Sequence, residues 1–329
     1  MKTKILYRFA MTLAFTGVMI ACNKNNNNSN SGQSSAELQT QSDDQTQVTN
    51  ETDGIADDVN ATLSGQSGVT GSSVTPGYSH GIAVQGGNHD TVASLICDAV
   101  VIRDTVSNPH TLTISYNGSN CTGTRTRKGT VVVSWGAATH WRDQGATVTV
   151  SINNLKVTRV RDGKSITING THLYTNVSGG SLTDLVLGKI QTVTHTITSD
   201  DMSITFDNNS KRTWHVARQR VYTNNDGLVI TTSGLHTDGS NPGISEWGTN
   251  RFGNSFATRI SKPLVVAQSC QFRITGGEVV VIRPEVTTTI TFGLDSTGVA
   301  TGCPGDGSYY FKLVWQGSGG KSYTFILPY

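Results

Sequence analysis

Apolar and polar residues alternate with a period of two along most of this chain, from Thr91 to its last residue, Tyr329. In residues 147–152, threonine and serine alternate with valine and isoleucine, and the pattern recurs in residues 166–169 and 192–198. Such alternation is typical of antiparallel strands with one apolar and one solvated face. Turn-forming residues such as Asp162-Gly163 separate the runs. The sequence therefore predicts an all-β body over residues 91–329, folded as a long antiparallel β-meander or sandwich.

The first 22 residues have the order of a secretory signal. Three basic residues precede an apolar run over residues 9–20, which ends in Ala21-Cys22. A membrane-spanning helix is the alternative, and it needs about 20 continuous apolar residues. This run is too short for that, because it is interrupted by two threonines and a glycine and is followed by an Asn-rich segment.

Residues 18–22, Val-Met-Ile-Ala-Cys, resemble the lipobox of bacterial lipoproteins, in which signal peptidase II cleaves before a cysteine that carries a diacylglycerol. Met19 stands where the family more often has leucine. The resemblance implies that residues 1–21 are a lipoprotein signal peptide and that Cys22 is the lipidated first residue of the mature protein. Its acyl chains would hold the protein to a membrane, since each buried CH₂ contributes about 0.8 kcal/mol.

Three segments are predicted between the lipidation site and the β body. Residues 22–41 are rich in Asn, Ser and Gln and predict a disordered tether. Residues 42–64 predict a short helix whose apolar stripe packs on the β body, and residues 65–90, rich in Gly, Ser and Thr, predict a linker. The apolar stripe of the helix consists of Val48, Ile55, Val59 and Leu63.

Apart from Cys22, the chain has four cysteines, Cys97, Cys121, Cys270 and Cys303. An even number in an exported protein suggests disulfides, and four cysteines permit three pairings. We favour Cys97 with Cys121 and Cys270 with Cys303, because each pair brackets a strand-turn unit of similar length. Free thiols and a zinc site are the alternatives. Because no Cys-x-x-Cys motif is present, we expect no metal site, and we expect no other cofactor.

Segments 97–135 and 270–315 resemble each other in outline. Each runs from a cysteine through a Thr-rich strand to a second cysteine, and then through a strand that ends in tryptophan, at Trp135 and Trp315. This predicts two equivalent disulfide-linked units flanking a central meander, in one continuous sheet or in two packed sandwiches. Chance similarity between Thr-rich strands is the alternative.

The body, with these units and the entry Pro263-Leu264-Val265-Val266 into the second one, resembles uncharacterised surface lipoproteins of Gram-negative bacteria. The resemblance implies lipid anchoring in the outer membrane and a β architecture. It assigns no functional residue, and it leaves open whether the body lies on the periplasmic or the cell-surface side.

Charge and motif content narrow the possible functions. Three of the 25 basic residues lie in the signal peptide, which leaves 22 against 23 acidic residues. Such a balance is poorly suited to neutralising phosphates, so we do not expect a nucleic-acid partner. The chain has no His-Glu-x-x-His motif, no phosphate-binding loop and no EF-hand loop. Asp57-Asp58 and Asp200-Asp201 are interpreted as helix-cap or turn residues. A non-enzyme is therefore favoured over an enzyme, and no catalytic residue is assigned.

Trp247 is the best candidate for ligand binding. It lies in residues 238–254, whose many Gly and Asn residues predict a loop longer than a hairpin needs, and long loops are often functional. An exposed indole flanked by Asn250, Arg251 and Asn254 would stack on a sugar ring and hydrogen-bond its hydroxyls. Packing is the alternative for Trp247, and core packing is favoured for Trp135 and Trp315.

Two further groups are interpreted as structural. The histidines at positions 172, 195, 215 and 236 are about 20 residues apart. Parity places His172 and His195 on apolar faces, so we expect residues at the margin of the core rather than metal ligands. Arg125, Arg127 and Lys128 alternate with threonines and predict a solvated strand edge that resists unwanted pairing. Contact with an anionic glycan or a lipid headgroup is the alternative for this basic cluster.

The sequence thus predicts a non-catalytic outer-membrane lipoprotein that acts as a binding or structural surface module. Its expected partners are the membrane, through the lipid, and a glycan or a surface protein. Glycan binding in a polysaccharide-uptake system and a surface glycosidase are the alternatives. A carboxylate pair in a deep cleft would favour the enzyme, an exposed aromatic platform the glycan binder, and a smooth polar sheet the structural role.

Overall fold

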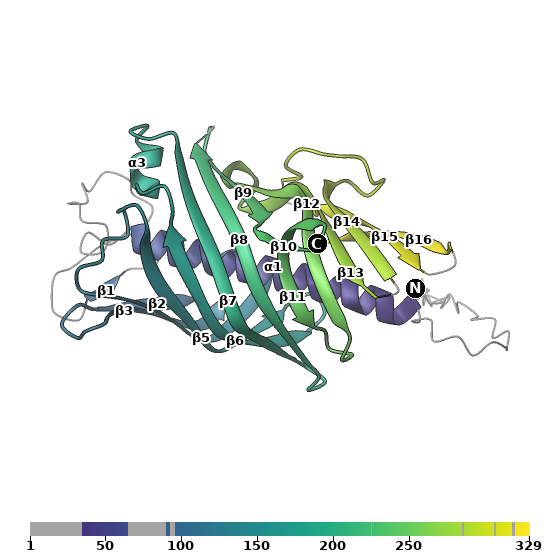
Figure 1. Ribbon diagram of the computed structural model, residues 1–329, viewed down its shortest axis with the longest axis horizontal. Coiled ribbons are helices and arrows are strands. Elements are labelled where there is room, and N and C mark those ends of the chain that lie inside the picture. Colours follow the sequence, from purple (N-terminus) through teal and green to yellow (C-terminus); the bar gives the residue numbers. More distant parts are fainter. Residues whose placement is uncertain are drawn as a thin grey trace, which may run out of the picture.

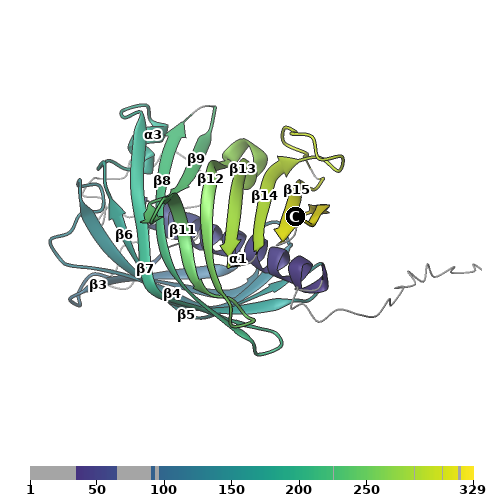
Figure 2. The same ribbon diagram turned by 45° about the vertical axis from the view of Figure 1, so that its right-hand side comes forward.

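A computed structural model of the chain describes residues 35–64, 90–92, 96–224, 226–284, 286–305, 307–317 and 320–329. It contains one long helix, α1 (Ser35–Ser64), and a strongly curved antiparallel sheet that wraps around this helix (Figures 1 and 2). The predicted all-β body is confirmed. The predicted signal peptide, Cys22, and most of the predicted tether and linker lie outside the described residues. Within the described part of the chain, no helix is long and apolar enough to cross a membrane.

The sheet has sixteen strands. They are β1 (Asp90–Val92), β2 (Ala99–Asp104), β3 (His110–Ser119), β4 (Arg125–Trp135), β5 (Ala146–Arg159), β6 (Ser165–Asn176), β7 (Thr192–Phe206), β8 (Lys211–Asn224), β9 (Leu228–Gly234), β10 (His236–Asp238), β11 (Asn241–Thr249), β12 (Ser255–Ala267), β13 (Arg273–Arg283), β14 (Val286–Leu294), β15 (Tyr310–Gly317) and β16 (Ser322–Pro328). A short helix, α3 (Leu182–Val186), and a 3-10 turn, η1 (Gln268–Cys270), lie between strands.

The sheet is a continuous meander. Strands that follow each other in the sequence pair with each other from β1 to β8 and again from β11 to β16. The long strand β8 joins the two runs, because residues 213–216 pair with β11 and residues 218–224 pair with β9. Of the two arrangements that the sequence left open, one continuous sheet and two packed sandwiches, the structure has the first.

Bulges and glycines bend the long strands sharply. The register shifts within four consecutive strand pairs, from β4–β5 to β7–β8. At these shifts Gly129 and Gly170 have φ angles of 141° and 135°, and a Cβ at either position would lie 2.5 or 2.9 Å from backbone oxygen of the next strand. Only glycine fits such a position. The resulting kinks curve the sheet into a trough, in which α1 lies (Figure 2).

Apolar side chains join α1 to the concave side of the sheet, which we call the inner face; the opposite side is the outer face. The larger of two apolar clusters packs α1 against strands β2 to β8, and the smaller one lies mainly between β9 and β15. All four residues of the predicted helical stripe belong to the larger cluster and are at most 1% exposed. The prediction that the helix packs on the β body is confirmed.

Helix α1 begins at Ser35, seven residues before the predicted start at Ser42, so the end of the predicted tether is helical. Its sequence is rich in Thr, Asp and Asn, which are weak helix formers, and contains no Lys or Arg. From Thr40 to Leu63 no residue is exposed. Burial in the trough, rather than intrinsic propensity, therefore makes this segment helical.

Both predicted disulfides, Cys97–Cys121 and Cys270–Cys303, are present. The first closes around β2 and β3 and is followed by β4, and the second closes around β13 and β14 and is followed by β15. Each disulfide therefore brackets two strands rather than the one expected. The third strand of each unit carries the buried tryptophan, Trp135 or Trp315. The two units lie toward opposite ends of the single sheet.

Candidate functional site

Arginines occupy buried positions on the inner face of the sheet. In β8, for example, every second residue is buried, and the buried series is Arg212, Trp214, Val216, Arg218, Arg220 and Tyr222. A guanidinium group in such surroundings is costly unless it is paired. Helix α1 supplies the partners through carboxylates at positions 43, 44, 51, 53, 57 and 58. We call these ion pairs the helix–arginine interface.

Toward the N-terminal end of α1, two neighbouring aspartates bind arginines at the ends of two different hairpins. Asp43 accepts hydrogen bonds of 2.6 and 2.8 Å from Arg159, at the end of β5. Asp44 pairs at 2.8 Å with Arg251, in the turn between β11 and β12. The Arg251 guanidinium also lies 3.5 Å from the centroid of the Phe206 ring. A cavity of about 30 Å³ beside Asp44 has room for water but not for an organic substrate.

The centre of the interface is a buried arginine–glutamate–arginine arrangement. Glu246 of β11 is fully buried and lies between Arg212, at 2.7 Å, and Arg218. Gln45 of α1 connects to the same group, since it donates to Glu246 at 3.2 Å and accepts from Arg212 at 2.8 Å. Arg218 also pairs with Asp53 of α1 at 2.9 Å. Helix and sheet thus share one hydrogen-bonded network.

Toward the C-terminal end of α1, strand β8 makes further contacts with the helix. Arg220, which is fully buried, pairs with Asp57 at 2.7 Å. One turn of helix later, the Asn60 side-chain amide donates to the Tyr222 hydroxyl oxygen at 2.6 Å. The side chains on one face of β8 therefore follow α1 along much of its length.

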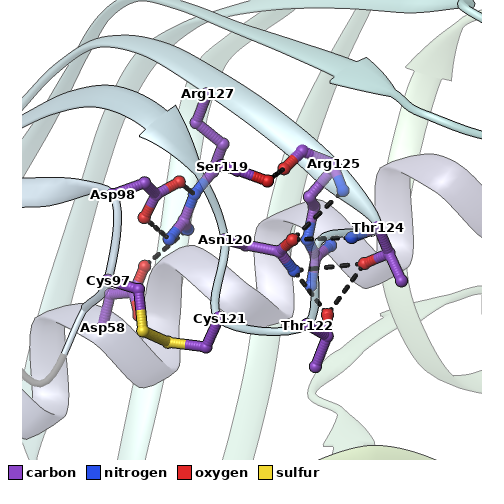
Figure 3. Close-up of a disulfide and its surroundings, with 10 residues drawn as sticks. All are labelled: Asp58, Cys97, Asp98, Ser119, Asn120, Cys121, Thr122, Thr124, Arg125 and Arg127. Carbon is purple, nitrogen blue, oxygen red and sulfur yellow. Dashed lines mark hydrogen bonds and ion pairs between the residues drawn. A yellow bond between two sulfur atoms is a disulfide. The ribbon is translucent and has the colours of Figure 1, made fainter.

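Arg125 and Arg127 bind α1 from the β4 side, near the first disulfide (Figure 3). Arg125 pairs with Glu51 at 2.7 Å, and Arg127 pairs with Asp58 and Asp98, each at 2.6 Å. The predicted solvated strand edge is wrong for both arginines, because β4 is paired on both sides and their parity points them inward. Lys128, on the outer face, is exposed as expected.

The interpretation of Asp57-Asp58 as cap residues is also wrong. Both lie well inside α1 and bind arginines of the sheet. Asp200-Asp201 lies at the bulge of β7, where the Asp201 carboxylate accepts a hydrogen bond from the Thr171 backbone N–H at 2.8 Å.

Burial and the arginines act in opposite directions on the carboxyl groups of the interface. Burial raises the pKa of Asp44 to about 7 although Arg251 opposes the shift, and it raises the pKa of Asp57 to about 6 against the attraction of Arg220. At Asp43 and Glu246 burial also favours the neutral form, but the arginines outweigh it and the pKa of each is lowered. The interface thus combines ionised carboxylates with two groups that titrate close to neutral pH.

Two of the four candidate histidines lie on the inner face, as parity predicted. His172 and His195 are 2% and 1% exposed, and burial lowers their pKa values to about 4 and about 3, so both are neutral at pH 7. The His195 ring lies between those of Trp141 and Tyr222, with centroids 4.8 and 4.9 Å away. In the described ranges, no cluster of three or more His, Cys, Asp or Glu residues could hold a metal ion.

The predicted loop around Trp247 is wrong, because residues 241–249 form strand β11, paired with β8 and β12. Trp247 lies on the outer face, opposite to its neighbour Glu246. Its indole stacks with the rings of His215 and His236, whose centroids are 5.2 and 4.1 Å away and whose planes are inclined by 11° and 20°. Two imidazole rings therefore pack against the indole.

The structure does not bring the predicted sugar-binding residues together. Asn250 and Asn254 close the turn between β11 and β12, where the Asn250 side chain accepts a hydrogen bond from the Asn254 backbone N–H at 3.0 Å. Arg251 points to the inner face and binds Asp44 of α1. Trp247 lies on the other face of the sheet. The predicted core roles of Trp135 and Trp315 are confirmed, since both are buried.

The helix–arginine interface was missed in the sequence. Its signal is visible there. The helical segment has seven acidic residues and no basic ones, and in strands such as β8 arginines alternate in step with the apolar residues.

Residues 77–81, Gly-Tyr-Ser-His-Gly, have the spacing of a Gly-x-Ser-x-Gly nucleophile motif. They stand in the Gly- and Ser-rich segment rather than between a predicted strand and helix, and they lie outside the described residues.

No model of a known protein family matches this chain, and no curated protein and no solved structure is similar to it.

Proposed function

We propose that the protein is a non-catalytic lipoprotein of the outer membrane, anchored through Cys22, whose body serves as a binding or structural surface module. The observation that carries the proposal is the helix–arginine interface. It fills the concave side of the sheet with the chain's own helix, where a substrate cleft would otherwise lie. The two disulfides are in keeping with an exported protein.

The ion pairs weigh against a surface glycosidase. Such enzymes need two carboxyl groups flanking a sugar in an accessible cleft, about 5 to 9.5 Å apart. The inner carboxylates Asp53 and Glu246 are each bound to at least one arginine and are buried between α1 and the sheet. Asp57 and Asp58 are partly exposed, and each is bound to a buried arginine. The helix would have to leave before Asp53 or Glu246 could meet a sugar, and Asp57 and Asp58 would have to give up their arginines.

The packed indole weighs against glycan capture by stacking. A sugar ring binds an aromatic platform through the open face of the ring, and two imidazole rings already stack with the Trp247 indole. The outer face instead carries rows of hydroxyls beside exposed apolar side chains such as Leu173. In one row across β5, β6 and β7, Thr147, Thr175 and Thr196 lie side by side. Such a surface favours the structural role or a protein partner.

Lipid anchoring is tested by changing Cys22→Ser in the producing bacterium. We expect the wild-type protein to incorporate radiolabelled palmitate and to fractionate with the outer membrane. The variant should lose the label and accumulate as an uncleaved precursor or a soluble form. Asn23→Ser, which leaves the cysteine in place, is the matched control. A variant that stays acylated and membrane-bound would refute the assignment.

The non-catalytic role is tested with the purified wild-type chain. We expect no release of reducing sugar from a panel of polysaccharides, and no binding on a glycan array that changes with Trp247→Ala. Glycan binding that Trp247→Ala abolishes while the variant remains folded would restore the glycan-binding alternative.

A further inference from the structure

We propose that the inner face also binds the α1 segment of a second copy of this chain, so that neighbouring molecules exchange helices. The inference deepens the proposed function by naming a partner for the body. It rests on that function only for the crowding of copies on one membrane, since the complementarity of helix and sheet belongs to the chain itself.

The interface is selective for α1 because it is built from matched charges. Each of the six carboxylates lies 2.6 to 2.9 Å from a nitrogen of an arginine. The helix itself carries no Lys or Arg that an inner face of arginines would repel. Every copy presents the same two surfaces, so the contacts made with a neighbour's helix equal those made with its own.

The connection between helix and sheet is long enough for exchange. Residues 65–89 join Ser64 to β1, and a chain of this length reaches at most roughly 80 Å when fully extended. Two bodies held on one membrane surface can therefore donate helices to each other without breaking any strand pairing. Whether a helix occupies its own sheet or a neighbour's depends on the effective concentration set by this connection and on the density of copies.

Neither surface is stable when left alone. A released α1 has weak helix formers throughout and gains its structure only on an inner face. An emptied inner face leaves Arg220 and Arg127 without their helix partners in a largely apolar trough. A molecule whose own helix has left therefore binds whichever α1 has the higher effective concentration, and on a crowded membrane a second copy supplies that segment.

Complementary charge reversals test the exchange. The helix-reversed chain carries Glu51→Lys and Asp57→Lys, and the sheet-reversed chain carries Arg125→Glu and Arg220→Glu. Each one alone opposes like charges across its own interface. Mixed at equal amounts and refolded together, they should form a heterodimer by reciprocal insertion, seen as a doubled mass in light scattering and as recovery of the thermal unfolding transition.

The control is one chain with all four substitutions, in which the pairs are restored within the molecule. It should fold alone as a monomer, which shows that the reversed charges are tolerated. If this control folds and the mixture yields no heterodimer, the proposal is overturned.

A second experiment uses the wild-type chain and decides the matter if the reversed chains do not fold. A fluorescent peptide of residues 35–64 is incubated with the full-length protein in 1 M NaCl, returned to low salt and separated by size. We expect the peptide to enter the protein, and at least tenfold less of a control peptide with Glu51→Gln, Asp53→Asn, Asp57→Asn and Asp58→Asn. Equal uptake of the two peptides, or no uptake of either, contradicts the proposal.

Discussion

Glu246 is the residue on which the buried charges of the inner face depend most. It is fully buried, and it is the carboxylate shared by Arg212 and Arg218. Removing one partner from a buried ion pair leaves an uncompensated charge in surroundings that water cannot reach, which costs about 3–5 kcal/mol. We expect Glu246→Gln to lower the free energy of unfolding by an amount in this range, as measured by urea denaturation.

The matched control is Glu278→Gln, which removes a carboxylate paired with the exposed Lys262 at 3.1 Å. Pairs of this kind contribute roughly 0–1 kcal/mol. A loss at Glu246 no larger than that at Glu278 would show that the arginines are solvated rather than buried.

Gly170 gives a second prediction at the scale of single residues. Its φ of 135° and its close approach to the backbone of β7 leave no space for a Cβ. We expect Gly170→Ala to destabilise the protein by about 2–4 kcal/mol, through backbone strain and local separation of β6 from β7. Gly276→Ala is the control, because no atom lies within 4 Å of its added Cβ, and it should change stability little. Equal effects in urea unfolding would contradict the role of Gly170 as a kink.

At the scale of elements, α1 is helical because packing against the sheet stabilises the helix. Its weak helix formers and its uncompensated acidic residues oppose helix formation in water, and the sheet supplies both the apolar contacts and the positive charge. We therefore expect a peptide of residues 35–64 to be mostly unfolded by circular dichroism in dilute buffer. A peptide that is mostly helical on its own would show that the helix forms without the sheet.

The same interface should make stability depend on pH between about 4 and 7. In the folded protein Asp44 and Asp57 have pKa values of about 7 and about 6, whereas in the unfolded chain both titrate near 3.8. The folded state therefore holds protons that the unfolded chain has released, and this stabilisation is lost as the pH rises through 6 and 7. Each proton changes the free energy of unfolding by up to about 1.4 kcal/mol per pH unit.

We expect stability to increase as the pH falls from 7.5 to 5. Below about pH 4 it should decrease, because the unfolded chain then binds protons at Asp43 and Glu246, whose pKa values are lowered in the folded protein. Asp44→Asn should flatten the upper part of this profile, and Asp238→Asn, at an exposed position, should not. Urea unfolding at a series of pH values measures the profile. An unchanged slope in Asp44→Asn would contradict the assignment.

At the scale of the whole molecule, the sequence predicted what depends on local pattern. Period-two alternation predicted the strands, the stripe from Val48 to Leu63 predicted a packed helix, and cysteine spacing predicted both disulfides. The first two succeed because apolar periodicity reports which side of an element faces away from water, and the third because each pair of cysteines brackets a local unit. The sequence did not predict that β11 is a strand, since its Pro, Gly and Asn residues are typical of loops and are tolerated here by pairing with β8 and β12.

What the sequence did not predict depends on the curvature of the sheet. Arg125 and Arg127 are charged and alternate with threonine, which is also the pattern of a solvated strand. Kinks at glycines such as Gly129 and Gly170 curve the sheet around α1. Because of this curvature, the side of β4 that carries the two arginines faces the helix rather than solvent. The loop predicted around Trp247 is wrong for a related reason, because its neighbours in space, His215 and His236, belong to strands that the sequence did not pair.

Hydrogen–deuterium exchange of the full-length protein, followed by mass spectrometry, tests most directly whether α1 is held inside the sheet by its apolar stripe and its ion pairs. We predict that amides of residues 41–63 are protected to the same degree as those of β8, and that Asp53→Lys together with Asp57→Lys removes the protection of α1 while the strands distant from it keep theirs. Exchange of α1 within seconds in the wild-type protein, beside a protected sheet, would contradict the account.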